Sequence, residues 1–371
     1  MGRMPRVTII TPTFNHAGYI GEAIDSVLAQ TFGDWEMLVV DDGSTDGTGD
    51  VVARYDDPRI RLFRKANGGI MRLHEGYNLA LGEARGDLIA ILEGDDYWPP
   101  DKLAFQVPEF DDPAVVLVSG YAHVVDDEHH DRGTVPPHLM PEDVRLNRPV
   151  GAATRAMILP FSLNFTFPVA TMMRRSALER IGGFQQPSDL PLVDYPTMLA
   201  MSLEGEFRFV ERNCGYWRRH PASTTTSRFP DILNGCYRES MRVAQDEGGR
   251  IGLTAAEIDA AEMHWEQFQS LRCSYMGRML AKKRRYKDAS RAFRLGNTFR
   301  RSRTNRQMAT LAARFTDLHL PVEWLFWLAH PTFSGNLLEG ASTLGGDPLV
   351  RVTDVDLPWP MYRRGSSAPT E

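Results

Sequence analysis

The sequence predicts an α/β fold in which helices flank a mostly parallel sheet. Through the first hundred residues, short apolar runs rich in β-branched residues alternate with segments of helical periodicity. Acidic clusters directly follow two of these runs, at the edge of the sheet where open α/β folds bind their ligands. The chain has 371 residues, more than one hydrophobic core usually serves, so we expect two units.

The first half of this pattern consists of four expected strands and two expected helices. Ile20, Ile24 and Val27 recur at helical spacing, and Gly86 is a typical stop for the second helix. The expected strands span residues 7–10, 36–40, 59–63 and 88–92, and the expected helices span residues 20–28 and 73–84.

The second half of the pattern is less regular. Residues 126–150 are rich in charged residues, histidine and proline, and are expected to be a loop. Residues 231–314 are helical in character. A strand is expected at 114–125, before this loop, and between the loop and the helical residues a strand is expected at 207–211 and helices at 175–181 and 194–203.

Composition narrows the class of protein. A net charge of −6 gives no general electrostatic case for a nucleic-acid partner, and we expect none. Three cysteines without a CxxC pair argue against a disulfide framework or zinc site and favour a reducing, cytoplasmic location. No apolar run reaches the roughly 18 residues of a membrane span.

The two acidic clusters are the candidate binding residues. Asp41 and Asp42 could accept hydrogen bonds from a base or ribose, or could simply form a turn before a helix cap at Ser44 or Asp46. In residues 93–96 three acids occur within four positions, so a hard divalent cation would relieve their repulsion. A solvated acidic turn is the alternative.

The order of motifs resembles the family 2 glycosyltransferases, which have the GT-A fold. The resemblance covers roughly residues 5–225. It implies a Rossmann-like mixed sheet flanked by helices, followed here by a mainly helical C-terminal region. The matching motifs are Pro12-Thr13-Phe14-Asn15, Gln30-Thr31, the Asp-Asp-Gly-Ser-Thr-Asp string at 41–46, Asn78, Ala84, Gly86, Glu93-Gly94-Asp95-Asp96, 98–103, 174–178 and 182–184.

This resemblance implies a nucleotide-sugar site, with Phe14 stacking on the base and Asp41 contacting base or ribose. Glu93 stands where the family usually has aspartate, which keeps the charge but adds a methylene. The full set expected to bind the nucleotide sugar is Pro12, Thr13, Phe14, Asp41, Asp42, Arg72, Glu93, Asp95 and Arg218.

The resemblance also implies a metal and a catalytic base. Asp95 would be the principal ligand of Mn²⁺ or Mg²⁺, with Asp96 assisting and His220 as a further ligand. Asp194 matches the aspartate of a Glu-Asp pair that supplies the base, and valine replaces the glutamate before it. Asp194 could instead cap a helix, and Asp189 is the alternative base.

The expected division places a catalytic domain at 1–230, with a donor half at about 1–110 and an acceptor half at about 111–230. Residues 231–371 form the helical region, and the tail at 365–371 is expected to be disordered. Residues 272–314 hold 14 Lys and Arg against one acid, which indicates either a solvated face or attraction to an anionic membrane. The candidate membrane anchors are Trp324, Phe326, Trp327 and Phe333.

The predicted function is therefore an inverting, metal-dependent transfer of a sugar, with UDP the expected nucleotide. The acceptor would be a hydroxyl of a glycan, a lipid-linked molecule or another component of the cell envelope. Two other interpretations stay open: a non-catalytic protein that keeps the fold, and a sugar-phosphate nucleotidyltransferase. The expected location is cytoplasmic, with peripheral contact at the inner face of the membrane as an option.

Overall fold

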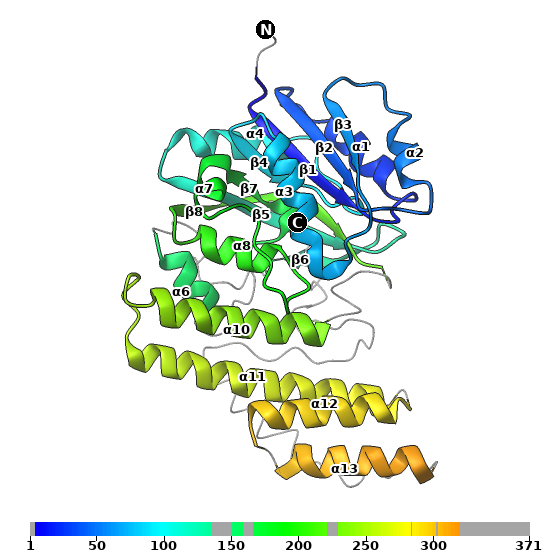
Figure 1. The fold of residues 1–371 in the computed structure, drawn as a ribbon, viewed down its shortest axis with the longest axis vertical. Coiled ribbons are helices and arrows are strands. Elements are labelled where there is room, and N and C mark those ends of the chain that lie inside the picture. Colours follow the sequence, from blue (N-terminus) through cyan, green and yellow to red (C-terminus); the bar gives the residue numbers. More distant parts are fainter. Residues whose placement is uncertain are drawn as a thin grey trace, which may run out of the picture. The chain divides into compact units, whose positions relative to one another are not determined.

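The computed structural model describes residues 4–135, 150–158, 166–220, 229–282, 284–301 and 303–318. Contacts within the chain divide these residues into two compact units, one up to residue 254 and one from residue 255 onward. The first unit is α/β and the second is helical (Figure 1).

Four parallel strands build the first part of the sheet, in the order β3-β2-β1-β4. Apolar side chains occupy both faces of these strands, as expected for a sheet covered by helices on both sides. The strands are β1 (Val7–Thr13), β2 (Trp35–Asp41), β3 (Ile60–Arg64) and β4 (Leu88–Ile91). Each was expected from the sequence within a few residues.

The second part makes the sheet mixed. β7 (Met172–Arg174) runs antiparallel to both β4 and β5 (Val115–Val125), and so joins the two parts. β8 (Glu206–Arg218) runs parallel to β5 along the whole length of β5. β6 (Asp131–Val135) pairs antiparallel with the C-terminal end of β5. The prediction of a loop at 126–150 is therefore wrong for residues 131–135. These residues are mostly polar, but their backbone pairs with β5 and so forms a strand.

Helices α1 (Ile20–Leu28) and α3 (Leu73–Glu83) pack on opposite faces of the sheet. The buried side of α1 shares a core with Met37 and Val39 of β2. On α3, a Cβ at Gly76 would lie 3.4 Å from Val40, whose side chain points the other way. The two helices therefore enclose β1 and β2 between them.

The remaining elements of the first unit are short. Most escaped the sequence-based prediction, because segments of three to seven residues are too short to show a period. Those not predicted are α2 (Thr48–Val52), η1 (Ile70–Arg72), α4 (Lys102–Gln106), η2 (Val107–Asp111), α6 (Ala152–Ile158), η3 (Pro168–Ala170) and β7. Those predicted are α7 (Arg175–Arg180) and α8 (Asp194–Met201).

Helix α10 (Phe229–Glu247) packs with the first unit, against α6 and α8. The Tyr195 hydroxyl, fully buried on α8, lies 2.5 Å from Ser240 Oγ on α10. The division between the units therefore falls one helix later than the boundary expected at residue 230.

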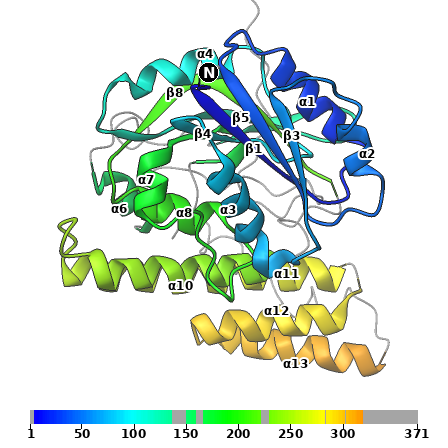
Figure 2. The same ribbon diagram turned by 45° about the horizontal axis from the view of Figure 1, so that its top comes forward.

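The second unit consists of α11 (Ala255–Lys282), α12 (Tyr286–Phe299) and α13 (Arg303–Leu318), and α12 and α13 lie side by side (Figure 2). Phe293 fills its core, where a Cβ at Gly277 would lie 2.7 Å from the Phe293 ring. Basic side chains such as Arg291 and Arg294 are exposed. Of the helices in the described residues, none is long and apolar enough to cross a membrane. Residues 320–333 and the tail at 365–371 lie outside the described part of the chain.

Lys102 is fully buried in the first unit and has no carboxylate partner among the contacts that the structure gives it. Its Nζ donates to Gln106 Oε1 at 2.7 Å and to the Thr171 carbonyl at 3.4 Å, and it lies 4.3 Å from the centre of the Trp98 ring. Burial lowers the pKa of Lys102 from 10.5 to about 7. Two acceptors suit a neutral amine, which has two N–H groups to donate.

We expect Lys102→Met to change how stability depends on pH. From pH 7 to 10.5 the unfolded chain holds a proton at Lys102 that the folded chain has lost, so raising the pH stabilises the wild type. Relative to Lys102→Met, the wild type should gain about 2 kcal/mol of unfolding free energy between pH 7 and pH 9. Urea unfolding of both proteins at the two pH values measures this. Parallel changes in the two proteins would show that Lys102 stays charged in the fold.

Candidate active site

The loops that follow β1 and β2 are held together by their own side chains. The Asn15 Oδ1 accepts from the Thr45 amide at 2.9 Å, and the Asn15 amide donates to Ser44 Oγ at 2.9 Å. Asp46 accepts from the Ala17 amide at 2.9 Å. Asn15 has a φ of 56°, a left-handed conformation that asparagine tolerates better than most residues. These contacts fix where the next residue, His16, projects.

The residues expected at the nucleotide differ in their surroundings. Phe14 is 43% exposed, so it does not pack in the core. Asp41 is buried and accepts from the Ser44 amide at 2.8 Å, as a turn-forming aspartate does. Asp42 forms an ion pair with Lys65.

Other members of that expected set are placed as follows. Arg72 is largely exposed, and its Nε donates a hydrogen bond to Glu75 Oε1 at 2.6 Å. This is the environment of a solvated helix residue. Thr13 is buried and Pro12 is half-buried at the end of β1. The nucleotide role of all these residues stays a prediction.

Asp95 lies between two imidazoles at the carboxyl end of β4. His220 Nε2 is 3.1 Å from Asp95 Oδ2, and His16 Nδ1 is 3.9 Å from Asp95 Oδ1. One ligand atom from each of these three residues lies within 4.8 Å of the other two. Burial alone would raise the pKa of Asp95, but the hydrogen bond with His220 and the proximity of His16 lower it overall. A charged carboxylate and two ring nitrogens can together hold a divalent cation.

Gly94 allows this close approach. A Cβ at position 94 would lie 2.5 Å from Thr13 Oγ1 and 2.9 Å from His16 Nδ1. Both distances are shorter than Cβ contacts in real proteins. Any side chain at position 94 would therefore push the loop that follows β1 away from the loop that follows β4. The glycine between the acidic residues thus lets the two strand ends meet.

Asp96, the expected second metal ligand, is directed elsewhere. Only 2% of it is exposed, and its Oδ1 accepts from the Arg218 amide at 2.8 Å, while its Oδ2 has no hydrogen-bond partner among the described residues. Burial, with Asp95 and Glu93 nearby, raises the pKa of Asp96 well above its ordinary value. This shift favours the neutral carboxyl over the carboxylate more than in an ordinary aspartate, and a neutral carboxyl is a poor metal ligand.

Arg218, expected at the diphosphate, is also engaged by the protein. Its guanidinium pairs with Glu22 and donates to the Asp95 carbonyl at 3.0 Å. It lies between the rings of Tyr19 and Tyr97, at 5.0 and 5.4 Å from their centres. Arg218 thus supports the backbone of the acidic cluster, and a phosphate contact stays a prediction.

We expect Asp96→Asn to be tolerated, since a neutral asparagine keeps the acceptor for the Arg218 amide. Asp96→Ala removes that acceptor and should cost about 1–3 kcal/mol of stability. Thermal unfolding and nucleotide titration with Mn²⁺ would measure both effects. Loss of Mn²⁺-dependent binding in a folded Asp96→Asn protein would instead establish Asp96 as a ligand.

Glu93 connects the acidic cluster to helix α3. Tyr77, on α3, donates its hydroxyl hydrogen to Glu93 Oε1 at 3.0 Å. Burial raises the pKa of Glu93 to about 8, and the charges of Asp95 and Asp194 add to this effect. At neutral pH Glu93 is therefore protonated and can donate a hydrogen bond to an incoming ligand.

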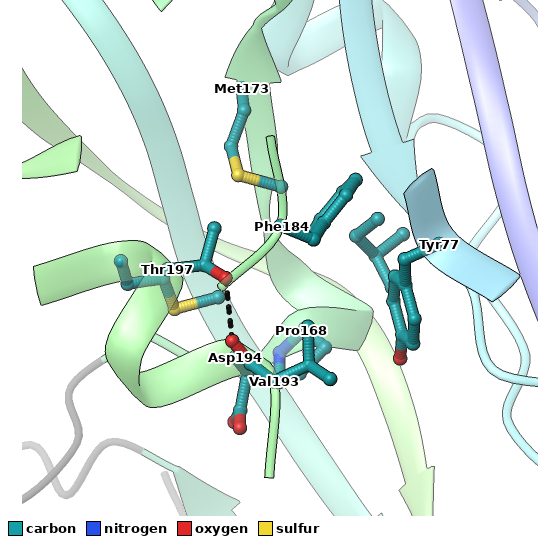
Figure 3. A pocket seen from close by; sticks show the side chains of 9 residues that line it. Tyr77, Pro168, Met173, Phe184, Val193, Asp194 and Thr197 are labelled. Atoms are coloured by element: carbon teal, nitrogen blue, oxygen red, sulfur yellow. Dashed lines mark hydrogen bonds between the residues drawn. The ribbon is translucent and has the colours of Figure 1, made fainter. Parts of the chain in front are cut away.

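Asp194 lies beside a small, mostly apolar pocket that includes Tyr77 (Figure 3). It is the first residue of α8, and the cap position before it is Val193, which makes no side-chain cap bond. The helix start is held by Thr197, whose Oγ1 donates to the Val193 carbonyl at 2.6 Å. The alternative that Asp194 serves as the helix cap is therefore not realised, and the residue is half-buried and lines this pocket.

Asp189, the alternative base, is placed differently. Its carboxylate pairs with Arg238 at 2.5 Å and its side chain is 56% exposed. Asp189 is engaged by Arg238 and is not among the described residues that line the pocket beside Tyr77, whereas Asp194 lines that pocket. Of the two candidates, the geometry favours Asp194.

Sequence reasoning missed His16, Tyr19 and Tyr77. Tyr19 stacks on the His220 ring with the ring centres 5.2 Å apart, and so orients that imidazole. The position of His16 in the sequence was a signal, because His16 follows the end of β1 by three residues. Since β1 pairs with β4, and β4 ends just before Asp95, the two residues lie at neighbouring strand ends.

Comparison with known proteins identifies a family whose model matches part of the chain. The family model described as "Glycosyl transferase family 2" matches residues 8–182. A glycosyltransferase of Nostoc sp. (strain PCC 7120), itself uncharacterized, is 28% identical over 229 residues, which are 60% of this chain and 67% of the relative. A putative teichuronic acid biosynthesis glycosyltransferase, TuaG of Bacillus subtilis, is 42% identical over 28% of this chain and 41% of its own length. The hyaluronan synthase of Pasteurella multocida is 39% identical over 30% of this chain, but only 11% of its own length is covered.

Two solved structures share the fold. TarS residues 1–349 of S. aureus, in complex with UDP, align with a TM-score of 0.53 at 16% identity, over 85% of this chain and 92% of that one. A mannosyltransferase of Pyrobaculum calidifontis, in complex with GDP-Man and Mn²⁺, aligns with a TM-score of 0.50 at 23% identity, over 88% and 83%. At these identities the likeness shows the fold alone.

Proposed function

We propose that this chain, a member of glycosyl transferase family 2, transfers the sugar of a UDP-sugar donor to an acceptor hydroxyl. The configuration at the anomeric carbon would invert, and UDP would be the leaving group. The observation that carries the proposal is the meeting of Asp95 with two imidazoles at the sheet edge where β1 and β4 end. Asp194, the first residue of α8, would supply the catalytic base, and its charge acts on Glu93.

The chain's own residues would divide the work between them. Phe14, exposed beside the edge of the sheet, offers a flat surface to a base, and the Asp41 carboxylate is near enough to the same edge to accept from ribose or base. Glu93, protonated at neutral pH, can donate to a hydroxyl of the donor sugar. Asp194 would accept the proton of the acceptor hydroxyl as that oxygen attacks the anomeric carbon and the nucleoside diphosphate leaves.

Asp95 and His220 would hold the divalent cation, Mn²⁺ or Mg²⁺. When bound there, the cation supplies positive charge that stabilises the diphosphate leaving group. The donor set fits this role, because Asp95 is held ionised and His16 Nδ1 is buried without a hydrogen-bond partner among the described residues.

The nucleotide and acceptor are proposed on narrower grounds. UDP is supported by the resemblance of residues 12–15 and 41–46 to the uridine-binding motifs of the family, while the neighbours of known structure carry UDP in one case and GDP-Man in the other. For the acceptor, the names of TuaG and hyaluronan synthase point to polysaccharide assembly. We propose a growing glycan or lipid-linked acceptor of the cell envelope, met in the cytoplasm.

Calorimetric titration with UDP, GDP and dTDP, each with and without Mn²⁺, tests the proposal. We expect one nucleotide, UDP, to bind with an affinity that Mn²⁺ increases. Binding of GDP or dTDP alone would overturn the choice of nucleotide. Binding of none to a folded protein would overturn the proposal and favour the non-catalytic interpretation.

The basic second unit could bring the enzyme to its acceptor. Exposed Arg291, Arg294 and Arg306 lie on α12 and α13, and we propose that such residues attract an anionic membrane surface. Sedimentation with vesicles containing phosphatidylglycerol, at low and high salt, tests this. Binding at low salt that salt removes supports the contact, and absence of binding at low salt overturns it. The candidate anchor Trp324 and its aromatic neighbours lie outside the described residues.

A further inference from the structure

The side chain of His16 is placed as a ligand would be, although no sequence motif pointed to it. The His16 amide is fixed by a bond to Thr48 Oγ1 at 2.9 Å, and its ring is half-buried. Its Nδ1 is buried, has no hydrogen-bond partner among the described residues, and faces Asp95 Oδ1 at 3.9 Å. A polar nitrogen in this position is costly to bury unless something binds it.

The separations match those of ligands around one ion. Bonds of about 2.1 Å from a metal to its ligands place two neighbouring donors roughly 3 to 4 Å apart. His220 Nε2 lies 3.1 Å from Asp95 Oδ2 and His16 Nδ1 lies 3.9 Å from Asp95 Oδ1, and one ligand atom from each of the three residues lies within 4.8 Å of the other two. The two imidazole rings are nearly perpendicular, with centres 6.4 Å apart, so each can direct a nitrogen to the same point without collision.

We propose that His16, Asp95 and His220 together form a three-ligand site that binds a first-row transition-metal dication before the nucleotide arrives. This inference deepens the proposed function, because it concerns the same cation, but it adds a ligand and an order of binding. With only one carboxylate and one imidazole, a cation would depend on the diphosphate to stay bound. With three protein ligands already converging, the protein can hold the cation by itself.

The same donor set selects among cations. Two of the three ligands are imidazole nitrogens, which suit transition metals, whereas Mg²⁺ prefers oxygen ligands in near-ideal octahedral geometry. We therefore expect Mn²⁺ to bind at least about tenfold more tightly than Mg²⁺ in the absence of nucleotide. The sequence alone left the choice between these two metals open.

The experiment titrates the full chain with Mn²⁺ in the absence of nucleotide and follows the electron paramagnetic resonance signal of free Mn²⁺. The variants are His16→Ala and, as a matched control, His130→Ala, whose imidazole is exposed in the turn between β5 and β6. Electron spin-echo envelope modulation of bound Mn²⁺ then reports coupled ¹⁴N nuclei. Circular dichroism and thermal unfolding establish that each variant is folded.

We expect one Mn²⁺ to bind the wild type, with modulation from two imidazoles, and Mg²⁺ to compete poorly. His16→Ala should lose one imidazole from the modulation and bind Mn²⁺ at least about tenfold more weakly, while His130→Ala should match the wild type. Equal Mn²⁺ binding and unchanged modulation in a folded His16→Ala would overturn the role of His16. If the wild type binds UDP with Mn²⁺ but binds no Mn²⁺ alone, the three-ligand site is refuted while the proposed function stands. If it binds neither, both are refuted.

Discussion

Asp194→Asn should reduce the turnover number by about 10²- to 10⁴-fold, the range that a general base contributes. Asparagine has nearly the same shape and keeps the start of α8, where the Thr197 bond to the Val193 carbonyl does not involve the Asp194 carboxylate. What the substitution removes is the ability to accept a proton from the attacking hydroxyl. Binding of the nucleotide should be nearly unchanged, because Asp194 is not one of the three residues whose ligand atoms converge at Asp95.

The measurement is the initial rate of nucleoside diphosphate release from the donor that the nucleotide titration selects, together with calorimetry of nucleotide binding. Asp189→Asn is the matched control, since Asp189 is the other candidate base and is exposed and paired with Arg238. We expect this control to keep the wild-type rate. If Asp189→Asn loses the rate and Asp194→Asn keeps it, the assignment of the base is wrong.

The parallel half of the fold was predictable because its sequence signals are local. Strands β1, β2 and β4 are mainly apolar and buried, and α1 repeats Ile20, Ile24 and Val27 on one face. β6 was missed because Asp131–Val135 is polar and half of it is exposed, so only pairing with β5 makes it a strand. β7 has three residues, too few to show any period.

In the site, sequence reasoning identified which strand ends matter more reliably than which atoms meet there. It predicted that Asp95 and His220, 125 positions apart in the sequence, share one metal site. In the structure His220 Nε2 lies 3.1 Å from Asp95 Oδ2. It could not distinguish the directions of the adjacent carboxylates Asp95 and Asp96, because that depends on whether the Arg218 amide is there to receive one of them. It also passed over His16, because the signal for this residue, its position just after the end of β1, indicates a ligand only once β1 is known to pair with β4.

Asp95→Asn should abolish the part of nucleotide binding that depends on Mn²⁺. The carboxylate is the only charged donor in the cluster of His16, Asp95 and His220, and His220 lies against it. An amide keeps the size of the side chain but removes the negative charge that attracts the cation. The loss of charge stabilisation at the leaving group is worth several kcal/mol, so the rate should also fall by at least about 10³-fold.

Calorimetry with UDP, with and without Mn²⁺, measures the effect on binding, and the rate of diphosphate release measures the effect on catalysis. Asp126→Asn is the control, because Asp126 belongs to the other acidic and histidine cluster of the described residues, with Glu128 and His130, and that cluster lies in an exposed turn. The control should behave as the wild type. A folded Asp95→Asn protein in which Mn²⁺ still strengthens UDP binding would mean that the cation is held elsewhere. The cluster at the end of β4 would then be an ion pair that stabilises the fold, because His220 and Asp95 at 3.1 Å can satisfy each other without a metal.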